Sequence, residues 1–212
     1  MARRLTGFGV TAAARAAAVT LVSAPSRQAS PPADFGRSPA RSAAAPDRPV
    51  QVGAARSPRP VDDAAAPVRV LVRSVGLDAR VSPVGVTGAG DMAVPPDPGV
   101  AGWYRFGPAP GSAHGSAVLV GHVDGDTGEL GEFASLYDVE PGDRVEVRRA
   151  GADPAGYRIV ARATVPRDAI PASAFRRGGP PVLTLITCAP PFVPEDGGYQ
   201  ANLIVTAEPA GG

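Results

Sequence analysis

From residue 67 onward, short stretches of alternating apolar and polar residues are separated by turn residues. Such alternation is typical of half-buried β-strands, because successive side chains point to opposite faces. We expect strands at residues 68–72, 75–81, 117–123, 143–149, 156–165, 182–187 and 203–207, a turn at 88–91, and short helical turns at 133–139 and 172–175. Many short strands with little helix predict an all-β sandwich or barrel.

The first 66 residues lack this pattern. Residues 1–24 begin with two arginines, continue with mostly small apolar residues and end in Ser-Ala, which is typical of a signal peptide or N-terminal membrane anchor. Arg15 interrupts the apolar stretch, so a disordered Ala/Arg tail is the alternative. Residues 25–66 are rich in Pro, Ala, Ser and Arg, which predicts a disordered linker or an unselected tail. The folded domain is then expected at 67–209.

Charge is divided unevenly along the chain. Residues 1–66 carry nine arginines against four aspartates, whereas the rest carries twelve arginines against sixteen acidic residues. The slightly acidic folded part has no basic stripe, which argues against nucleic-acid binding. No cofactor or metal is expected, since one cysteine cannot build a usual thiolate zinc site. A calcium site in the acidic loop 124–129 is an alternative, although its spacing matches no standard loop.

Two residues that can perform chemistry each end an apolar strand. Cys188, the only cysteine, is either an inert core atom or a nucleophile. His122 follows residues 117–121, and is either structural or the base and acid that a thiol nucleophile needs. Only the fold can bring the two together. His114 lies in a Gly- and Pro-rich loop and is expected to be solvated.

Four motifs in this region resemble the sortases, the cysteine transpeptidases of Gram-positive surfaces, over about residues 67–209. LTLITC at 183–188 resembles their TLxTC signature, and GHVDG at 121–125 resembles their histidine motif. GWYRFGPAPG at 102–111 and GYQANLIV at 198–205 are similar to class F (or class E) sortases of actinobacteria. The resemblance implies an eight-stranded β-barrel with one or two short helices, on the extracellular side of the membrane.

The resemblance also implies a reaction. Cys188 would attack an LPxTG-like sorting signal of surface proteins and form a thioacyl enzyme, which an amine acceptor such as a cell-wall precursor resolves. His122 would protonate the leaving amine, and Thr187 would line the substrate groove.

One residue of the family pattern is missing. Sortases carry an arginine on the strand after the cysteine, whereas no arginine follows Arg177 here. The expected position falls at Gln200 or Asn202, whose amides are neutral donors; losing one oxyanion donor costs roughly 10²–10³ in rate. Arg105 or Arg162 is a candidate to enter the site instead. The chain is therefore a slow sortase, a sortase with a relocated arginine, or a weakly active or inactive peptide-binding domain of this fold.

Other features allow two interpretations each. Asp124 either orients His122 or bonds its own backbone in a turn. Trp103 is a core or groove-edge aromatic residue, and the Pro-rich stretch 188–198 is expected to be a surface loop that gates substrate or serves as a rigid spacer. A different exported cysteine hydrolase or transpeptidase remains an alternative, and it predicts a different fold.

Overall fold

The computed structural model describes residues 30–36 and 65–211. The predicted signal or anchor segment, 1–24, and most of the predicted linker lie outside these ranges. Within the described ranges, no helix is long and apolar enough to cross a membrane.

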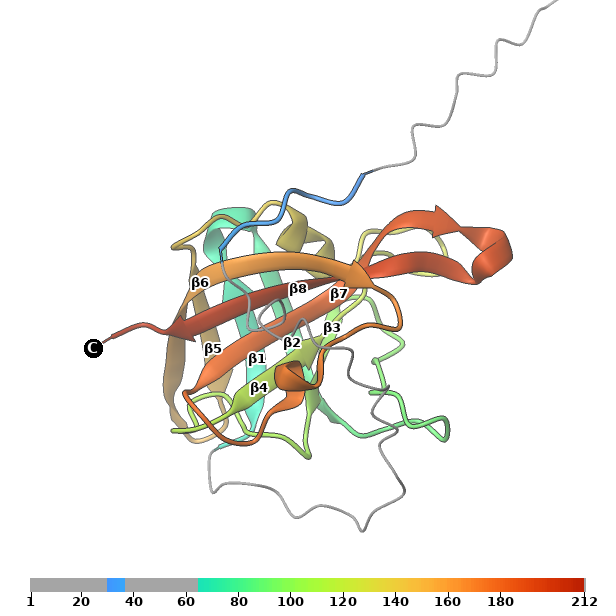
Figure 1. Ribbon diagram of the computed structural model, residues 1–212. Helices are drawn as coiled ribbons and strands as arrows, with labels where there is room; N and C mark the ends of the chain where they lie inside the picture. Colours follow the sequence, from blue (N-terminus) through green and yellow to red (C-terminus); the bar gives the residue numbers. More distant parts are fainter. Residues whose placement is uncertain (1–29, 37–64, 212) are drawn as a thin grey trace, which may run out of the picture.

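Eight strands close into the predicted barrel (Figure 1). Around the barrel they follow the order β1-β2-β3-β4-β7-β8-β6-β5. Their bounds are β1 Pro67–Val72, β2 Leu77–Val84, β3 Val100–Tyr104, β4 Ser116–Val120, β5 Arg144–Arg149, β6 Ala152–Pro166, β7 Val182–Val193 and β8 Gly198–Pro209. The β2–β3 and β4–β7 pairs are parallel, and the other pairs are antiparallel.

Alternation along β7 and β8 separates an inner and an outer face. Leu183, Leu185 and Leu203 belong to the large buried cluster inside the barrel. Ile186 and Ile204 form a smaller outer cluster with Val118, on which residues of the β6–β7 connection pack. Because side chains alternate with a period of two, Cys188 shares the outer face with Ile186.

The described helical segments are all short 3₁₀ helices. The two predicted helical turns are present as η3 Glu132–Tyr137 and η4 Ala172–Phe175, and two more turns follow strands as η2 Arg73–Val75 and η5 Pro194–Asp196.

Two strand predictions need correction. β3 was not predicted, because its five residues include Gly102 and Trp103 and are nearly all buried, which leaves no alternation to detect. The Pro-rich stretch expected to be a loop is instead the end of β7, η5 and the start of β8. These segments form a hairpin arm that projects beyond the barrel wall (Figure 1). Near its tip Phe192 lies opposite Tyr199, and the two rings pack edge to face with centroids 4.9 Å apart.

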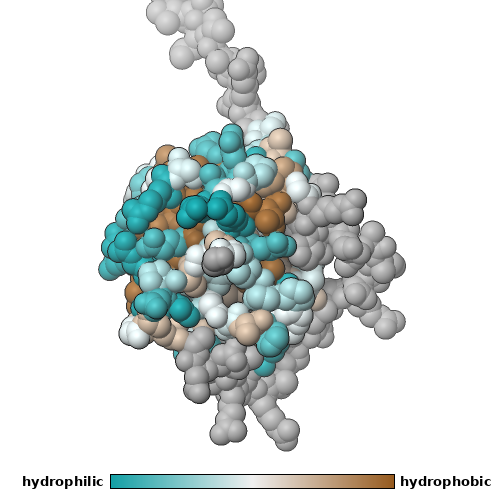
Figure 2. All heavy atoms as spheres, turned by 90° about the vertical axis from the view of Figure 1, so that its left-hand side faces the viewer, coloured by the Kyte–Doolittle hydropathy of each residue, from teal (hydrophilic) through white to brown (hydrophobic). Residues whose placement is uncertain are grey.

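The surface beside the C-terminus is polar. Figure 2 shows this side mostly in hydrophilic colours, with hydrophobic atoms confined to patches between them. Apolar side chains are thus largely directed into the barrel, as the alternation predicts.

Candidate active site around Cys188

The parallel pairing of β4 with β7 relates the positions of Cys188 and His122. Val120 lies opposite Ile186, and the Gly121 amide donates to the Ile186 carbonyl at 3.1 Å. β4 ends at Val120, and His122 lies two residues beyond it, as Cys188 lies two residues beyond Ile186 on β7. The β4–β7 register therefore leads both residues toward the same end of these two strands, although they are far apart in the sequence.

Thr187 does not line the outer face. Its side chain is 1% exposed, and its hydroxyl donates to the Gly121 carbonyl at 2.9 Å. The expectation that Thr187 contacts substrate is wrong, because alternation turns it away from Cys188. Its hydroxyl instead fastens β7 to the segment that carries His122.

The His122 ring is oriented by the main chain. Its Nε2 lies 2.8 Å from the Pro95 carbonyl oxygen. A carbonyl only accepts hydrogen bonds, so Nε2 carries a proton and Nδ1 is the atom suited to proton exchange. In the described part of the chain, no hydrogen bond joins this ring to the Cys188 thiol.

The surroundings of Cys188 favour the neutral thiol. Burial raises the pKa of the half-buried Cys188, the negative charge of Asp124 raises it further, and the positive charge of Arg167 lowers it. Burial is the largest of these three effects, and together with Asp124 it outweighs Arg167. Only a small fraction of Cys188 is therefore a thiolate at neutral pH.

Two tyrosines complete this wall of the site. The Tyr137 hydroxyl donates to the Cys188 carbonyl at 2.8 Å, and burial raises the pKa of Tyr137 to about 12. The Tyr199 hydroxyl donates to the Asp124 carboxylate at 2.6 Å. Asp124 thus binds the hairpin arm, a role that neither of its two predicted interpretations included.

Gln200 and Asn202 lie two residues apart on β8, the strand that pairs with the one carrying Cys188. Asn202 is directly opposite Cys188, and its amide donates to the Arg167 carbonyl at 2.9 Å. The Gln200 amide donates to the Gly198 carbonyl at 2.6 Å and to the Asp196 carbonyl at 3.4 Å. Both amides are therefore bonded to the main chain.

Arg167 is the residue that the sequence analysis missed. It follows the end of β6, and its amide donates to the Gln200 carbonyl at 2.9 Å. Its Nη1 donates to the carbonyl of Asp196 at 3.0 Å, the same oxygen that the Gln200 amide approaches. The guanidinium thus lies beside Gln200, one of the two residues at which the family arginine is expected. No sequence signal links residue 167 to residue 200, since only the β6–β8 pairing makes them neighbours.

The two arginines suggested by the sequence lie elsewhere. Arg105 follows β3, whose antiparallel register places it beside the start of β4, at the opposite end from His122. Its guanidinium stacks on Phe106, 4.9 Å from the ring centroid. Arg162 is 8% exposed and donates to the carbonyls of Tyr137 and Val139. Arg105 is thus not at Cys188, and the Arg162 guanidinium is bound at η3.

The remaining candidates contribute no reactive group to the site. His114 is exposed, and Trp103 is 9% exposed with its indole NH donating to the Pro108 carbonyl at 3.2 Å. Among the described residues, no group of three His, Cys, Asp or Glu side chains is arranged to hold a metal ion.

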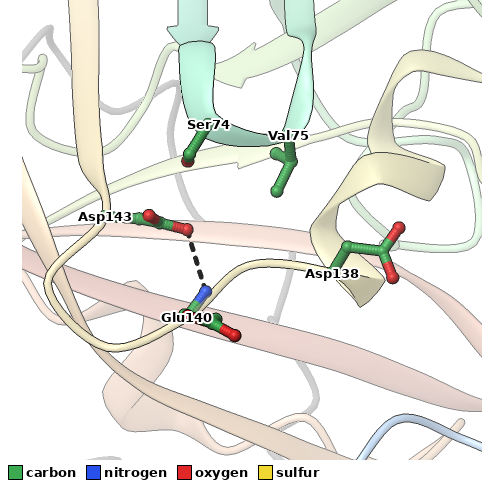
Figure 3. Close-up of a pocket in the computed structure, with 5 residues that line it drawn as sticks. All are labelled: Ser74, Val75, Asp138, Glu140 and Asp143. Carbon is green, nitrogen blue, oxygen red and sulfur yellow. Dashed lines mark hydrogen bonds between the residues drawn. The ribbon is translucent and has the colours of Figure 1, made fainter.

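An open pocket of about 460 Å³ is lined by residues of η2 and of the connection between η3 and β5. Figure 3 shows its lining, Ser74, Val75, Asp138, Glu140 and Asp143, with the Asp143 carboxylate accepting from the Glu140 amide. These residues include no nucleophilic thiol, imidazole or cation.

Known proteins support the family expected from the motifs. The family model described as the sortase domain matches residues 70–210. No curated protein sequence matches the chain significantly.

Solved structures support the same fold. Sortase C2 of Group B Streptococcus Pilus Island 1 is 21% identical, with a TM-score of 0.52, and the match covers 68% of this chain and 73% of that one. Sortase C-1 of Actinomyces oris gives 21% identity and a TM-score of 0.51 with the same coverages. Streptococcus agalactiae sortase C1 gives 20% identity and a TM-score of 0.53 over 68% of this chain and 66% of that one. At such identities the structural likeness shows the fold alone. The family match over most of the chain leads to the conclusion that the chain belongs to the sortase family.

Proposed function

We propose that this chain is a class F or class E sortase that cleaves an LPxTG-like sorting signal and transfers it to an amine acceptor. Sortases are cysteine transpeptidases that act on sorting signals of surface proteins. The observation that supports the proposal is the β4–β7 register, in which Val120 pairs with Ile186, two residues before His122 and Cys188 respectively. The chain would act on the extracellular side of the membrane, with residues 1–24 as its anchor or signal.

The reaction divides into two acyl transfers. The Cys188 thiolate attacks the carbonyl carbon of the scissile amide, the C–N bond breaks, and His122 protonates the departing amine. The incoming amine then attacks the thioester, gives up a proton to His122, and releases the thiolate. Because the pKa of Cys188 is raised, we expect the reactive thiolate–imidazolium pair to be a minor population at neutral pH.

Arg167 supports an active enzyme rather than an inactive domain. It brings a positive charge next to Gln200, one of the two residues at which the family arginine is expected. We assign Arg167 the role of stabilising negative charge at the thiolate and at the developing oxyanion, with Gln200 and Asn202 holding it through main-chain contacts. An exposed cation is screened by solvent, so this stabilisation is weaker than that of a buried donor.

A weakly active or inactive peptide-binding domain is the second candidate. It is favoured by the absence of an arginine after Cys188 and by the raised pKa of that thiol. The third interpretation, a cysteine hydrolase of another fold, is excluded by the barrel and the family match.

Mass spectrometry of the full chain with an LPxTG-type peptide separates the first two candidates. We expect a thioacyl adduct on Cys188 that is absent in Cys188→Ala and in His122→Ala. Peptide binding without any adduct, across a library of sorting-signal peptides, would support the non-catalytic candidate.

A further inference from the structure

Residues 30–36 lie along β6, although more than 110 positions separate them from it in the sequence (Figure 1). β5 pairs with β6 only as far as Arg158, whereas β8 accompanies it to Pro166. Beyond Arg158, the edge of β6 that faces β5 has no β5 partner. Within the described chain, Phe35 pairs with this edge, because Phe35 and Arg162 exchange two main-chain hydrogen bonds, each 2.9 Å. A single antiparallel bridge therefore covers this edge.

Side chains make the contact specific to the sequence Asp34-Phe-Gly36. The Asp34 carboxylate accepts from the Thr164 amide at 2.8 Å, and the Phe35 ring lies under the Arg162 guanidinium, 4.9 Å from its centroid. Gly36 has φ +70°, and a Cβ there would meet the Val160 carbonyl oxygen at 2.1 Å. An acidic, an aromatic and a glycine residue are thus each required at their own position.

Arg162 connects the docked segment to the site. Its Nη2 donates to the Ala33 carbonyl at 2.7 Å, while its Nη1 donates to the Tyr137 carbonyl. The Tyr137 hydroxyl in turn donates to the Cys188 carbonyl at 2.8 Å. A continuous series of contacts therefore runs from residue 33 to the main chain of the nucleophile.

We propose that residues 33–36 are an intramolecular ligand of the barrel, and that their docking holds Tyr137 against the Cys188 main chain. The segment belongs to the stretch that the sequence predicted to be a disordered linker. It would thus tie this part of the stretch to β6 and tighten the site at the same time. The inference does not depend on which substrate the site takes.

The first experiment tests docking by hydrogen exchange on the full chain. We expect the Phe35 and Arg162 amides to be protected, and Gly36→Ala to speed their exchange by at least about tenfold, because the clash with Val160 opposes docking. Gly151→Ala is the matched control, since its φ of +68° carries the same strain but nothing lies within 4 Å of the added Cβ. A Phe35 amide that exchanges at the rate of a free peptide would overturn the proposal. So would protection that falls on dilution, which would identify a second copy as the occupant.

The second experiment tests the connection through Tyr137, using iodoacetamide alkylation of Cys188 and requiring no substrate. We expect Gly36→Ala to speed alkylation about threefold or more, because a looser main chain exposes the half-buried thiol. In a Tyr137→Phe background the same substitution should change the rate little, since the connection is already broken. An equal acceleration in both backgrounds would refute the role of Tyr137. A positive result would stand even if no sorting peptide reacted.

Discussion

Replacing Arg167 by glutamine removes the positive charge beside Cys188 while keeping a polar side chain. Across β8, Cys188 is level with Val165, so Arg167 is two strand spacings away and two residues further along, or about 12 Å at the main chain. Unit charges at that distance interact by about 0.3 kcal/mol at the dielectric constant of water and about 1.4 kcal/mol at an effective value of 20. These energies correspond to a loss of about 2-fold to about 10-fold in rate. Because Arg167 is exposed, we expect the lower half of this range.

Two assays measure this effect independently. Alkylation of Cys188 as a function of pH should show a higher thiol pKa in Arg167→Gln, since the positive charge favours the thiolate. Turnover of a sorting peptide should fall in kcat/KM. Added salt should reduce the wild-type rate more than that of the variant, because the screening length is about 10 Å at 0.1 M.

A control and a rescue make the test decisive. Arg158→Gln removes an exposed arginine of β6 that lies nine positions before Arg167, and should leave both measurements unchanged. Gln200→Arg in the Arg167→Gln background should restore the lost rate, because it returns a cation to the same neighbourhood. If Arg167→Gln behaved like Arg158→Gln, the assignment of Arg167 would be wrong.

Two further substitutions test the charge of Asp124 near Cys188 and the packing of Gly121. Asp124→Asn should lower the pKa of Cys188 and move its alkylation profile to lower pH, the opposite sign to Arg167→Gln, because the Asp124 charge opposes ionisation of the thiol; an unchanged profile would contradict the electrostatic account. Gly121→Ala should cost roughly 1–3 kcal/mol in the free energy of unfolding, because the added Cβ would lie 2.6 Å from the buried Phe133 ring. Thermal unfolding measures this cost. Gly178→Ala is the control, because a Cβ added there has no atom within 4 Å. Equal stabilities of the two variants would show that the contact between residue 121 and Phe133 is unimportant.

Local alternation made most of the barrel predictable. A strand with one buried face shows a period of two in its sequence, and β1, β5 and much of β6 were found in this way. The fully buried β3 lacks that period, and the extension of β7 through Cys188-Ala-Pro-Pro was hidden by its prolines. The hairpin arm exists because β7 and β8 pair beyond the barrel wall, which is a property of two segments and not of either one.

The sequence by itself determined the candidate pair: one thiol and one imidazole, each near the end of an apolar strand, within family-like motifs. Their placement toward the same end of β4 and β7, the burial of Thr187 and the distance of Arg105 from the site were decided by strand register, because a one-residue shift would turn each side chain to the other face. The same pairing brought Arg167 to Gln200 and gave Phe35 an open edge on β6. These contacts join residues that are 33 or more positions apart, and only the closed barrel makes them neighbours.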